Sequence, residues 1–402
     1  MNILSTGIIR TCTSCQMCAA VCPMQAIDIR LDKDGFYRPT VSEKCIDCGL
    51  CVSVCYKYDP NVRMTSPEAL DNMPLYAAVA RDNDIIAATT SGGVADLLAR
   101  QLTGDGYACV GVCYDVQNKR AYDKIVTTPA ESACFRGSKY IQSYTVDAFR
   151  EIVKSGVDRK IAVFGTPCHI YALDKYLRSW NRRGNFILID LYCHGCPTLN
   201  LWHKYLKEIE TGFHGQEPDN VNFRSKVHGW GRFCILVTAN GKDVFKSNGT
   251  KDPFFSLFFS NHLLNEACHD CSLRSTLAYT DIRLGDFWGR CYDLNSRGVS
   301  VVSIASESGQ QAFDSICDKL EITQHKYADA LPYQSWGKRY HPNPIVRHVL
   351  LEQVADPGMP LNVSVKYYRS RQAVGAKVKA FLKSAVLRLP DRWVNCLKRM
   401  YH

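Results

Sequence analysis

The sequence has no run of about 18 consecutive apolar residues, the length that a helix needs to cross a bilayer. Its most apolar segment, residues 254–264, is short and is interrupted by serine, asparagine and histidine. The residues before Cys12 also lack the apolar core of a signal peptide. We therefore expect a cytoplasmic protein without a membrane-spanning helix.

Acidic residues are scarce toward the C-terminal end. Residues 363–402 contain ten lysines and arginines and one acid, Asp391, which gives this segment a net charge of +9. Apolar residues between Val378 and Met400 recur at helical spacing, which predicts a basic amphipathic helical tail. Such a tail lies on an anionic membrane surface or packs on the protein body, and both alternatives stay open. A nucleic acid partner is not expected, because no recognition motif accompanies the charge.

A glycine fingerprint G-x-G-x-x-G after a strand is also lacking, so a standard Rossmann dinucleotide site is not supported. Residues 61–75 are interrupted by prolines and are predicted to form a linker. Residues 76–345 alternate between strand-like and helix-like stretches, which predicts a mixed α/β domain with ligand loops at the strand ends. The predicted strands are 75–80, 107–113, 160–164, 186–191, 232–238 and 299–305. The predicted helices are 94–102, 146–153, 170–177, 199–209 and 310–320.

Cysteine, in contrast, is abundant, with 20 residues in the chain. In a protein without export signals this number indicates metal or redox use. Within residues 1–60, the spacing C-x2-C-x2-C-x3-C occurs twice, over 12–22 and 45–55. This repeat predicts a ferredoxin-like domain with two 4Fe–4S clusters, in which the fourth cysteine of each run binds the cluster of the other run.

The predicted ligands of cluster one are Cys12, Cys15, Cys18 and Cys55. The predicted ligands of cluster two are Cys45, Cys48, Cys51 and Cys22. Two zinc sites are the alternative, but zinc does not explain why a C-x2-C-x2-C triplet occurs twice. Pro23 follows the first run as in the usual ferredoxin pattern, whereas Tyr56 follows the second.

Three segments of the α/β region place a polar turn where a strand or loop meets a helix. Residues 90–94 open a helical pattern with two glycines, so free N–H groups and the helix dipole there could hold a pyrophosphate. An ordinary capped helix start is the alternative. Residues 165–169 and 190–197 each follow a predicted strand. The carboxyl ends of strands are where ligands bind in α/β sheets.

Seven short motifs occur in a specific order along the chain. They are Thr90-Ser-Gly-Gly-Val94, Gly137-Ser-Lys-Tyr140, Gly165-Thr-Pro-Cys168, Asp190-Leu-Tyr-Cys-His-Gly195, Asn222-Phe-Arg224 with Gly229-Trp230, Cys268-x2-Cys271 and Gly285-Asp-Phe-Trp-Gly289. In this combination the sequence resembles the coenzyme F420 hydrogenase/dehydrogenase beta-subunit family over residues 10–345. It is most similar to bacterial members found in polysaccharide-biosynthesis settings.

The resemblance implies an iron–sulfur flavoprotein that binds FAD and exchanges electrons with an organic substrate or with coenzyme F420. The residues that it assigns to the FAD site are Ser91, Gly92, Gly93, Lys139, Gly165, Thr166, Pro167 and Asp286. A lysine beside a reduced flavin would stabilise the negative charge of the flavin. An ordinary surface lysine is the alternative for Lys139.

In hydrogenase-type members of the family, a third 4Fe–4S cluster lies beside the flavin. The matching positions here are Cys168, Cys193, Cys268 and Cys271, with Cys196 as a competitor for Cys193. Zinc at the same thiolates, or plain buried thiols, are the alternatives. The other cysteines outside the two N-terminal runs are predicted to be buried thiols.

Reduction of an organic substrate also needs protons, and His169 and His194 on the two strand-end turns are the candidate donors. Our first hypothesis is an FAD- and iron–sulfur-dependent oxidoreductase that acts on an organic substrate, for example a saccharide precursor. The second is an electron-transfer subunit that relays electrons to a partner oxidoreductase or to coenzyme F420. A ferredoxin-like electron donor is an expected partner in either case.

Overall fold

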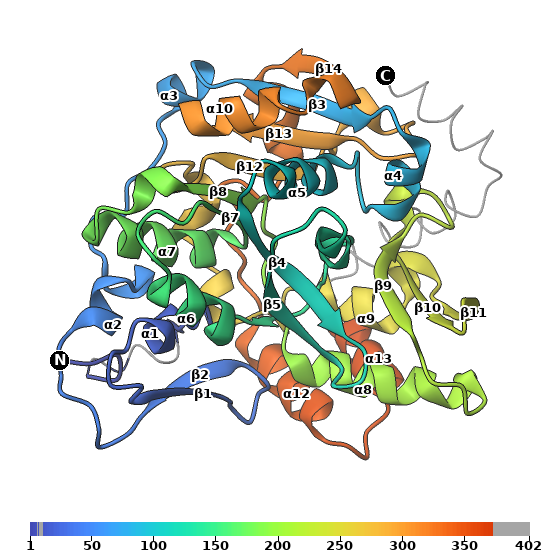
Figure 1. Ribbon diagram of the computed structural model, residues 1–402. Coiled ribbons are helices and arrows are strands. Elements are labelled where there is room, and N and C mark those ends of the chain that lie inside the picture. Colours follow the sequence, from blue (N-terminus) through green and yellow to red (C-terminus); the bar gives the residue numbers. More distant parts are fainter. Residues whose placement is uncertain (6, 8–10, 373–402) are drawn as a thin grey trace.

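The centre of the molecule is a nine-stranded mixed sheet, shown in Figure 1 for the computed structural model, which describes residues 1–5, 7 and 11–372. Its strands, in spatial order, are β14 (Leu320–His325), β3 (Leu75–Ala80), β13 (Ser300–Ile304), β12 (Ile282–Asp286), β8 (Phe186–Leu191), β7 (Ile161–Phe164), β4 (Ala108–Asp115), β5 (Arg120–Val126) and β6 (Ser143–Tyr144). The sheet agrees with the mixed α/β fold that the sequence predicts.

The middle of this sheet is parallel. β12, β8, β7 and β4 pair in parallel, and β13 runs antiparallel to both β12 and β3. β3 therefore points in the same direction as the parallel strands. Runs such as Ile161–Phe164 are apolar at every position because both faces of a parallel sheet are covered. The carboxyl ends of β3, β12, β8 and β7 consequently meet at one edge of the sheet.

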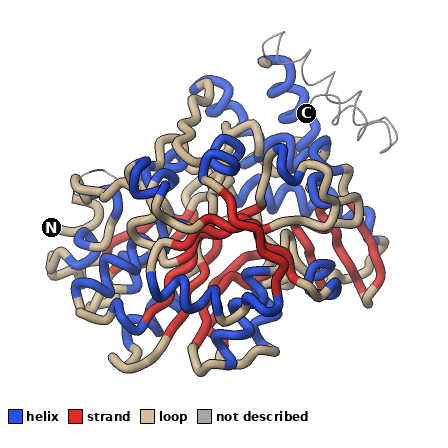
Figure 2. The backbone as a smooth tube through the Cα atoms, turned by 90° about the horizontal axis from the view of Figure 1, so that it is seen from above, coloured by secondary structure: helices blue, strands red, loops and turns tan. Residues whose placement is uncertain are grey.

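Helices cover both faces of the sheet, and Figure 2 shows the strands running through the middle of the molecule. The helices around the sheet are α4 (Asn83–Ala88), α5 (Val94–Gly104), α6 (Val146–Lys154), α7 (Pro167–Ser179), α10 (Glu307–Asp314) and α11 (Tyr327–Ala330). Helix α7 begins with Pro167, whose fixed backbone angle and missing N–H suit the first helical position.

The N-terminal domain contains a two-stranded sheet and short helices that carry cysteines. Its elements are α1 (Met17–Ala20), β1 (Ile27–Leu31), β2 (Tyr37–Val41), α2 (Leu50–Ser53) and the 3-10 helix η2 (Tyr56–Tyr58). The two cysteine runs share an unusual backbone. Ser14 and Asp47 have positive φ angles of 62° and 51°, and Gln16 and Gly49 have angles of 64° and 82°. Equivalent positions therefore turn in the same way, which confirms an internal repeat.

A second core lies below the large sheet in Figure 1. It consists of a three-stranded sheet and four helices: β9 (Asn220–Ser225), β10 (Cys234–Ala239), β11 (Lys242–Lys246), α8 (Leu199–Glu210), α9 (Pro253–Phe258), α12 (Pro344–Ala355) and α13 (Leu361–Arg371). Its centre is aromatic, with Trp202 stacked on Phe223 at 4.4 Å between ring centroids.

The structure differs from the sequence-based boundaries in three places. The predicted linker 61–75 contains helix α3 (Pro67–Asp71), and Thr65 bonds to Thr276, so this segment packs on the body of the protein. The predicted helix 310–320 ends at Asp314, and Leu320 opens β14. β14 was missed because only Leu320 and Ile322 of this edge strand are apolar and most of its side chains are exposed or half-buried.

The predicted basic tail is described only up to residue 372. Within that range, Leu361 and Val365 of α13 are buried against the second core, and the remainder of the tail lies outside the described residues. Among the described residues, no helix is long and apolar enough to span a membrane. Cys113 and Cys134, which the sequence analysis treats as buried thiols, form a disulfide.

Candidate functional site

The four cysteines predicted to bind cluster one lie together in the structure. Burial raises the pKa of Cys55 to about 12, and the neighbouring thiols of Cys15 and Cys12 act in the same direction. Burial also raises the pKa of Cys18, and the neighbouring thiols of Cys15, Cys12 and Cys55 act in the same direction. Cys55 of the second run therefore lies beside the first three cysteines of the first run, the arrangement that the predicted crossed pattern requires. Buried thiols with raised pKa values lose their protons only when a cation such as iron binds them.

The four cysteines predicted to bind cluster two surround a small hollow at the surface. Cys22, Cys45, Cys48 and Cys51 all line it, together with apolar neighbours that include Met24 and Ile46. Cys48 is exposed and Cys51 is buried, so the hollow opens to the outside on one side. Cys51 also acts on the pKa of Cys18, which places the two sets next to each other.

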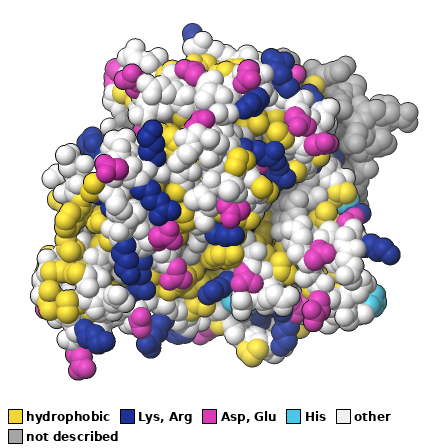
Figure 3. Space-filling view, viewed as in Figure 1, with side chains coloured by type: hydrophobic (Ala, Val, Ile, Leu, Met, Phe, Trp, Pro, Cys, Tyr) yellow, Lys and Arg dark blue, Asp and Glu magenta, His cyan; other side chains and the backbone are white. Residues whose placement is uncertain are grey.

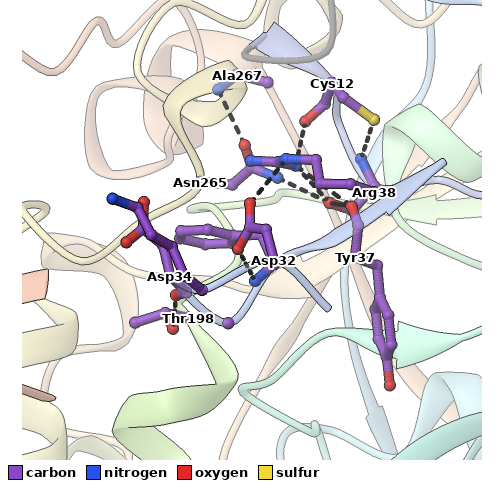
Figure 4. A network of polar contacts seen from close by, with 12 residues as sticks. Cys12, Asp32, Asp34, Tyr37, Arg38, Thr198, Asn265 and Ala267 are labelled. Carbon is purple, nitrogen blue, oxygen red and sulfur yellow. Dashed lines mark hydrogen bonds and ion pairs between the residues drawn. The ribbon is translucent and has the colours of Figure 1, made fainter. Parts of the chain in front are cut away.

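A polar network ties the N-terminal domain to the rest of the protein (Figure 4). Arg38 of β2 pairs with Asp32 at 3.2 Å and donates to the carbonyl of Cys12 at 3.1 Å. Ser14 bonds to Arg38 and accepts a hydrogen bond from the fully buried Asn265 at 3.0 Å. Because Asn265 lies three residues before Cys268, this network aligns cluster one with the third set of cysteines.

The third set of cysteines gathers at the edge where the parallel strands end. Burial raises the pKa of Cys193 to about 12, and Cys268 and Cys271 contribute in the same direction. The thiol that acts most strongly on Cys168 is Cys15 of cluster one, followed by Cys196 and Cys193. Five thiols thus surround the third site, and both Cys193 and Cys196 face the other three. The competition between them that the sequence indicates is present in the structure.

A cavity of about 490 Å³ extends from this third set along the edge of the sheet. Its volume is in the range of cofactor and ligand sites. It is lined by residues that follow the ends of β7, β8 and β12, as predicted from the strand ends, and by the turn before α5. Of the residues that the resemblance assigns to FAD, those lining the cavity are Ser91, Gly93, Lys139, Gly165, Thr166 and Asp286. Gly92 and Pro167 lie beside them in the chain.

The turn before α5 is held rigidly. A Cβ atom on Gly92 would lie 2.2 Å from the carbonyl oxygen of Ala78, so only glycine fits there. Gly93 has a φ of 88°, which also favours glycine. Lys226 donates to the carbonyls of Ile86 and Ser91 at 2.7 Å each. The first N–H groups of α5 are consequently presented to the cavity by a fixed backbone.

Lys139 lines the cavity, but its ammonium group is already engaged. It donates to the carbonyls of Cys134, Phe135 and Arg136 at 3.1, 3.1 and 2.8 Å. Burial lowers its pKa to about 7. The side chain is therefore neither an ordinary surface lysine nor a free donor to a ligand, and it holds the 3-10 helix η3 (Glu131–Phe135) against the cavity.

Asp286, at the end of β12, organises an aromatic wall. It accepts hydrogen bonds from Arg224 at 2.9 Å and from the indole of Trp230 at 2.8 Å. Trp230 stacks on Trp288 at 4.6 Å, and the Arg224 guanidinium lies 3.8 Å from the centroid of Phe233. Both carboxylate oxygens of Asp286 are thus occupied, so its role is to position this wall.

The two histidines are poor proton donors in this geometry. Burial lowers the pKa of His169 and of His194 to about 4, which makes both imidazoles neutral at pH 7. The ring nitrogens of His194 are engaged by Asn261 at 2.8 Å and by Tyr340 at 3.0 Å. Both histidines line the cavity, but their environment favours positioning over general acid catalysis.

Among the described residues, no three histidine, cysteine or acidic side chains are arranged around a point as for a single metal ion. Cys22, Cys45, Cys48 and Cys51 instead line a hollow between them. Four thiolates around one space are the donor set that a 4Fe–4S cluster requires.

Comparison with known proteins identifies both parts of the chain. Residues 158–330 match the family that comprises the C terminus of the beta subunit of coenzyme F420 hydrogenase/dehydrogenase, and residues 11–59 match a "4Fe-4S dicluster domain". Residues 158–330 are therefore similar to the C-terminal domain of the coenzyme F420 hydrogenase/dehydrogenase beta-subunit family. Since members are subunits of redox enzymes, this beta-subunit homologue is an oxidoreductase component with an N-terminal iron–sulfur domain.

Two curated relatives of this beta-subunit homologue carry related names. A subunit of the F(420)H(2) dehydrogenase of Methanosarcina mazei is 23% identical over 334 residues, which cover 78% of this chain and 84% of the relative. The beta subunit of the coenzyme F420 hydrogenase of Methanococcus voltae is 25% identical over 267 residues, which cover 62% and 87%. A solved structure, the xenon-derivatised F420-reducing [NiFe] hydrogenase complex of Methanosarcina barkeri, matches with 14% identity and a TM-score of 0.49, covering 77% of this chain and 94% of that one.

Several residues of the site have no role assigned by sequence reasoning. Arg224 and Trp288 occur in the quoted family motifs, but only the structure shows that they share a wall with Asp286. Arg274 and Asn265 lie in no motif, and their nearness to Cys268 and Cys271 in the sequence is the sole signal that could have indicated them.

Proposed function

We propose that this chain is the electron-transferring subunit of an oxidoreductase and that it relays electrons between a redox partner and coenzyme F420 or a second protein. The observation that carries the proposal is the continuous succession of cysteine sets. The surface hollow of cluster two adjoins Cys18, and Cys15 of cluster one adjoins Cys168 at the edge of the cavity. The names of both curated relatives, which are subunits that act with coenzyme F420, support the same reading.

The clusters would be held by the three predicted donor sets. Cluster one has Cys12, Cys15, Cys18 and Cys55, cluster two has Cys22, Cys45, Cys48 and Cys51, and the third has Cys168, Cys193, Cys268 and Cys271, with Cys196 as the competitor for Cys193. The resident thiols would contribute spacing and limited contact with water, because Cys18 is buried and Cys15, Cys168 and Cys193 are partly buried.

The cavity would hold FAD. The fixed turn before α5 would present the amide donors at the start of that helix to the pyrophosphate, and the aromatic wall at Trp288 would shield one side of the cavity. FAD supplies the conversion of single electrons into electron pairs. Arg136 lines the cavity while its guanidinium neutralises Asp96 at 2.8 Å, so the start of α5 does not repel an anion.

The surface around cluster two suits a protein partner. Met24 and Ile46, which line the hollow, are 44% and 62% exposed. Figure 3 shows hydrophobic side chains gathered on the side where this domain lies in Figure 1. An apolar rim around an exposed redox centre excludes water when a partner docks. We assign this rim to the partner oxidoreductase subunit.

A second function, reduction of an organic substrate such as a saccharide precursor, is favoured by the polar mouth of the cavity. Gln334, Ser335 and Lys338 line the cavity, and Gln334 donates to the carbonyl of Asp286 at 2.8 Å. Polar groups of this kind recognise hydroxyl-rich ligands.

Anaerobic purification with quantification of iron, sulfide and flavin tests the proposal. About eight irons per chain with FAD support two clusters, and about twelve support three. Zinc in place of iron, or the lack of a flavin, would reject it. Reduced protein is then mixed with coenzyme F420 and with candidate saccharide precursors in separate assays. Rapid oxidation by the coenzyme alone supports the relay, whereas oxidation by a saccharide alone favours the second function.

A further inference from the structure

Arg274 occupies a central position among the third set of cysteines. Its side chain is 3% exposed, and its guanidinium donates to the carbonyls of Cys193 at 3.2 Å, of His194 at 2.6 Å and of Cys268. A further bond reaches the carbonyl of Lys338 at 3.0 Å. One side chain therefore joins the turn after β8, the cysteine pair loop and the mouth of the cavity.

No acidic side chain among the described residues pairs with the positive charge of Arg274. None of the ion pairs formed by the described residues includes it, whereas the neighbouring Arg283 forms a two-bonded pair with Asp190 at 2.7 and 2.6 Å. Arg283 also donates to the carbonyl of Arg274 and so fixes its backbone. A buried cation without a counter-charge is costly, because carbonyl dipoles replace only part of its hydration.

The groups that this charge faces are thiols. Arg274 bonds directly to the backbone of two of them, Cys193 and Cys268, so its charge lies on the loops that carry these thiols. A 4Fe–4S cluster held by four thiolates carries a net negative charge. Such a cluster would supply the counter-charge that the protein itself does not provide.

We propose that Arg274 is the counter-charge and the positioning residue of the third cluster. This inference rests on the proposed function, because it requires a cluster at the third set. Its fork of donors fixes the relative position of the loops that carry Cys193 and Cys268, which come from distant parts of the chain. Its charge stabilises the reduced cluster, which is more negative than the oxidised one, and so raises the reduction potential.

The test uses the full-length protein, purified without oxygen, and two substitutions. Arg274→Gln removes the charge, and Arg274→Lys keeps the charge but removes the planar fork. Arg182→Gln is the matched control, because Arg182 is also buried but donates to Ile152, Ser155 and Gly156, away from the cysteines. Iron content is measured together with the potential of each cluster by redox titration followed by electron paramagnetic resonance.

We expect Arg274→Gln to shift the potential of one cluster to lower values and to leave the two N-terminal clusters unchanged. Arg274→Lys should retain that potential. Its iron content should fall below that of the parent, by up to about four irons per chain, because the loops that carry Cys193 and Cys268 are no longer fixed. If Arg274→Gln keeps the iron content and the cluster potential of the parent, the proposed role of Arg274 is wrong. This result would not argue against the third cluster itself. If Arg274→Gln does not fold, parent-like iron content and thermal stability in Arg274→Lys overturn the positioning role.

The cluster itself is tested separately. If the double variant Cys268→Ala, Cys271→Ala keeps all the iron of the parent, the third cluster does not exist, and both that part of the proposed function and this inference fall. If that variant loses about four irons while Arg274→Gln behaves as the parent, the cluster stands and only this inference is wrong.

Discussion

The hydroxyl of Tyr56 accepts a hydrogen bond from the backbone N–H of Ser272 at 3.1 Å. Tyr56 follows Cys55 of cluster one, and Ser272 follows Cys271 of the third set. The bond therefore joins two cysteine sets through one residue on each side. Tyr56 stands where the first run has Pro23, and a proline at this position could not make this contact.

Substitution of Tyr56 by phenylalanine should remove this link without opening a cavity. We expect a loss of about 1 kcal/mol in the free energy of unfolding and slower electron transfer between the N-terminal domain and the third set. Tyr58→Phe is the control, because the Tyr58 hydroxyl bonds within the N-terminal domain, to the carbonyl of Ile3 at 2.8 Å. Rapid-mixing kinetics with dithionite should separate the two variants, and equal rates would contradict a role in electron transfer.

Alanine at both Cys268 and Cys271 should remove about four irons per chain while the N-terminal clusters keep theirs. Cys234→Ala is the matched control, since this buried thiol bonds to the carbonyl of Ser247 and faces no other cysteine. Iron and sulfide analysis of the two variants shows whether the third set of cysteines holds a cluster. A loss of zinc instead of iron would show that the third set is a structural metal site.

Gly92→Ala should abolish flavin binding and lower the stability of the protein. The added methyl group would lie 2.2 Å from the carbonyl of Ala78 and 2.8 Å from the backbone nitrogen of Ser300, so the turn before α5 must move. Gly104→Ala at the end of the same helix meets no atom within 4 Å and should be neutral or stabilising by up to about 1 kcal/mol. Flavin absorbance and thermal unfolding measure both effects; a full flavin content in Gly92→Ala would exclude this turn from the site.

Asp286→Ala should destabilise the protein by about 3–5 kcal/mol, because it leaves the guanidinium of Arg224 buried without its counter-charge. The stack of Trp230 on Trp288 should loosen at the same time, which tryptophan fluorescence detects. Asp243→Ala removes the carboxylate of an exposed pair with Lys246 and should change stability by less than about 1 kcal/mol. Similar effects of the two substitutions would show that Asp286 does not organise the wall.

Asp123 of β5 gives a pH-dependent contribution to stability. Burial raises its pKa from 3.8 to about 7, with a smaller opposing effect of Ser143. Between about pH 4 and pH 7 the unfolded chain releases a proton that the folded protein keeps, so the contribution of Asp123 to stability falls as the pH rises.

The substitution Asp123→Asn replaces the carboxyl group by an amide that cannot titrate, so the variant should lack this dependence. The difference in unfolding free energy, variant minus parent, should rise between pH 4 and pH 7 by up to about 4 kcal/mol. Denaturant titrations at a series of pH values measure this difference. A difference that stays constant with pH would show that Asp123 titrates normally in the folded state.

The elements with strong local patterns were the ones that could be predicted. The buried strand β8 and the helix α5 begin where the sequence predicts, because their apolar runs and flanking turns leave few alternatives. The position of Cys55 beside the first run and of Cys22 beside the second could likewise be predicted, since it follows from a repeated spacing. Strands such as β12 were missed because Arg283 and Asp286 interrupt the apolar pattern.

The composition of the site could be predicted only in part. Spacing indicated which cysteines act together, but not that Cys15 adjoins Cys168 or that Lys139 directs its donors to three carbonyls. Those facts depend on contacts between segments that lie far apart in the chain. Arg274 illustrates the limit, because a buried charge without an acidic partner is visible only when all its neighbours are in place.

The interlocked arrangement of the two N-terminal cysteine runs also bears on how the protein matures. Each predicted cluster site takes three thiols from one run and the last thiol from the other, so neither site can be completed before both halves of the repeat have come together. Insertion of the inorganic cores should therefore be an all-or-none event during biogenesis, and chains that carry one core alone should be rare.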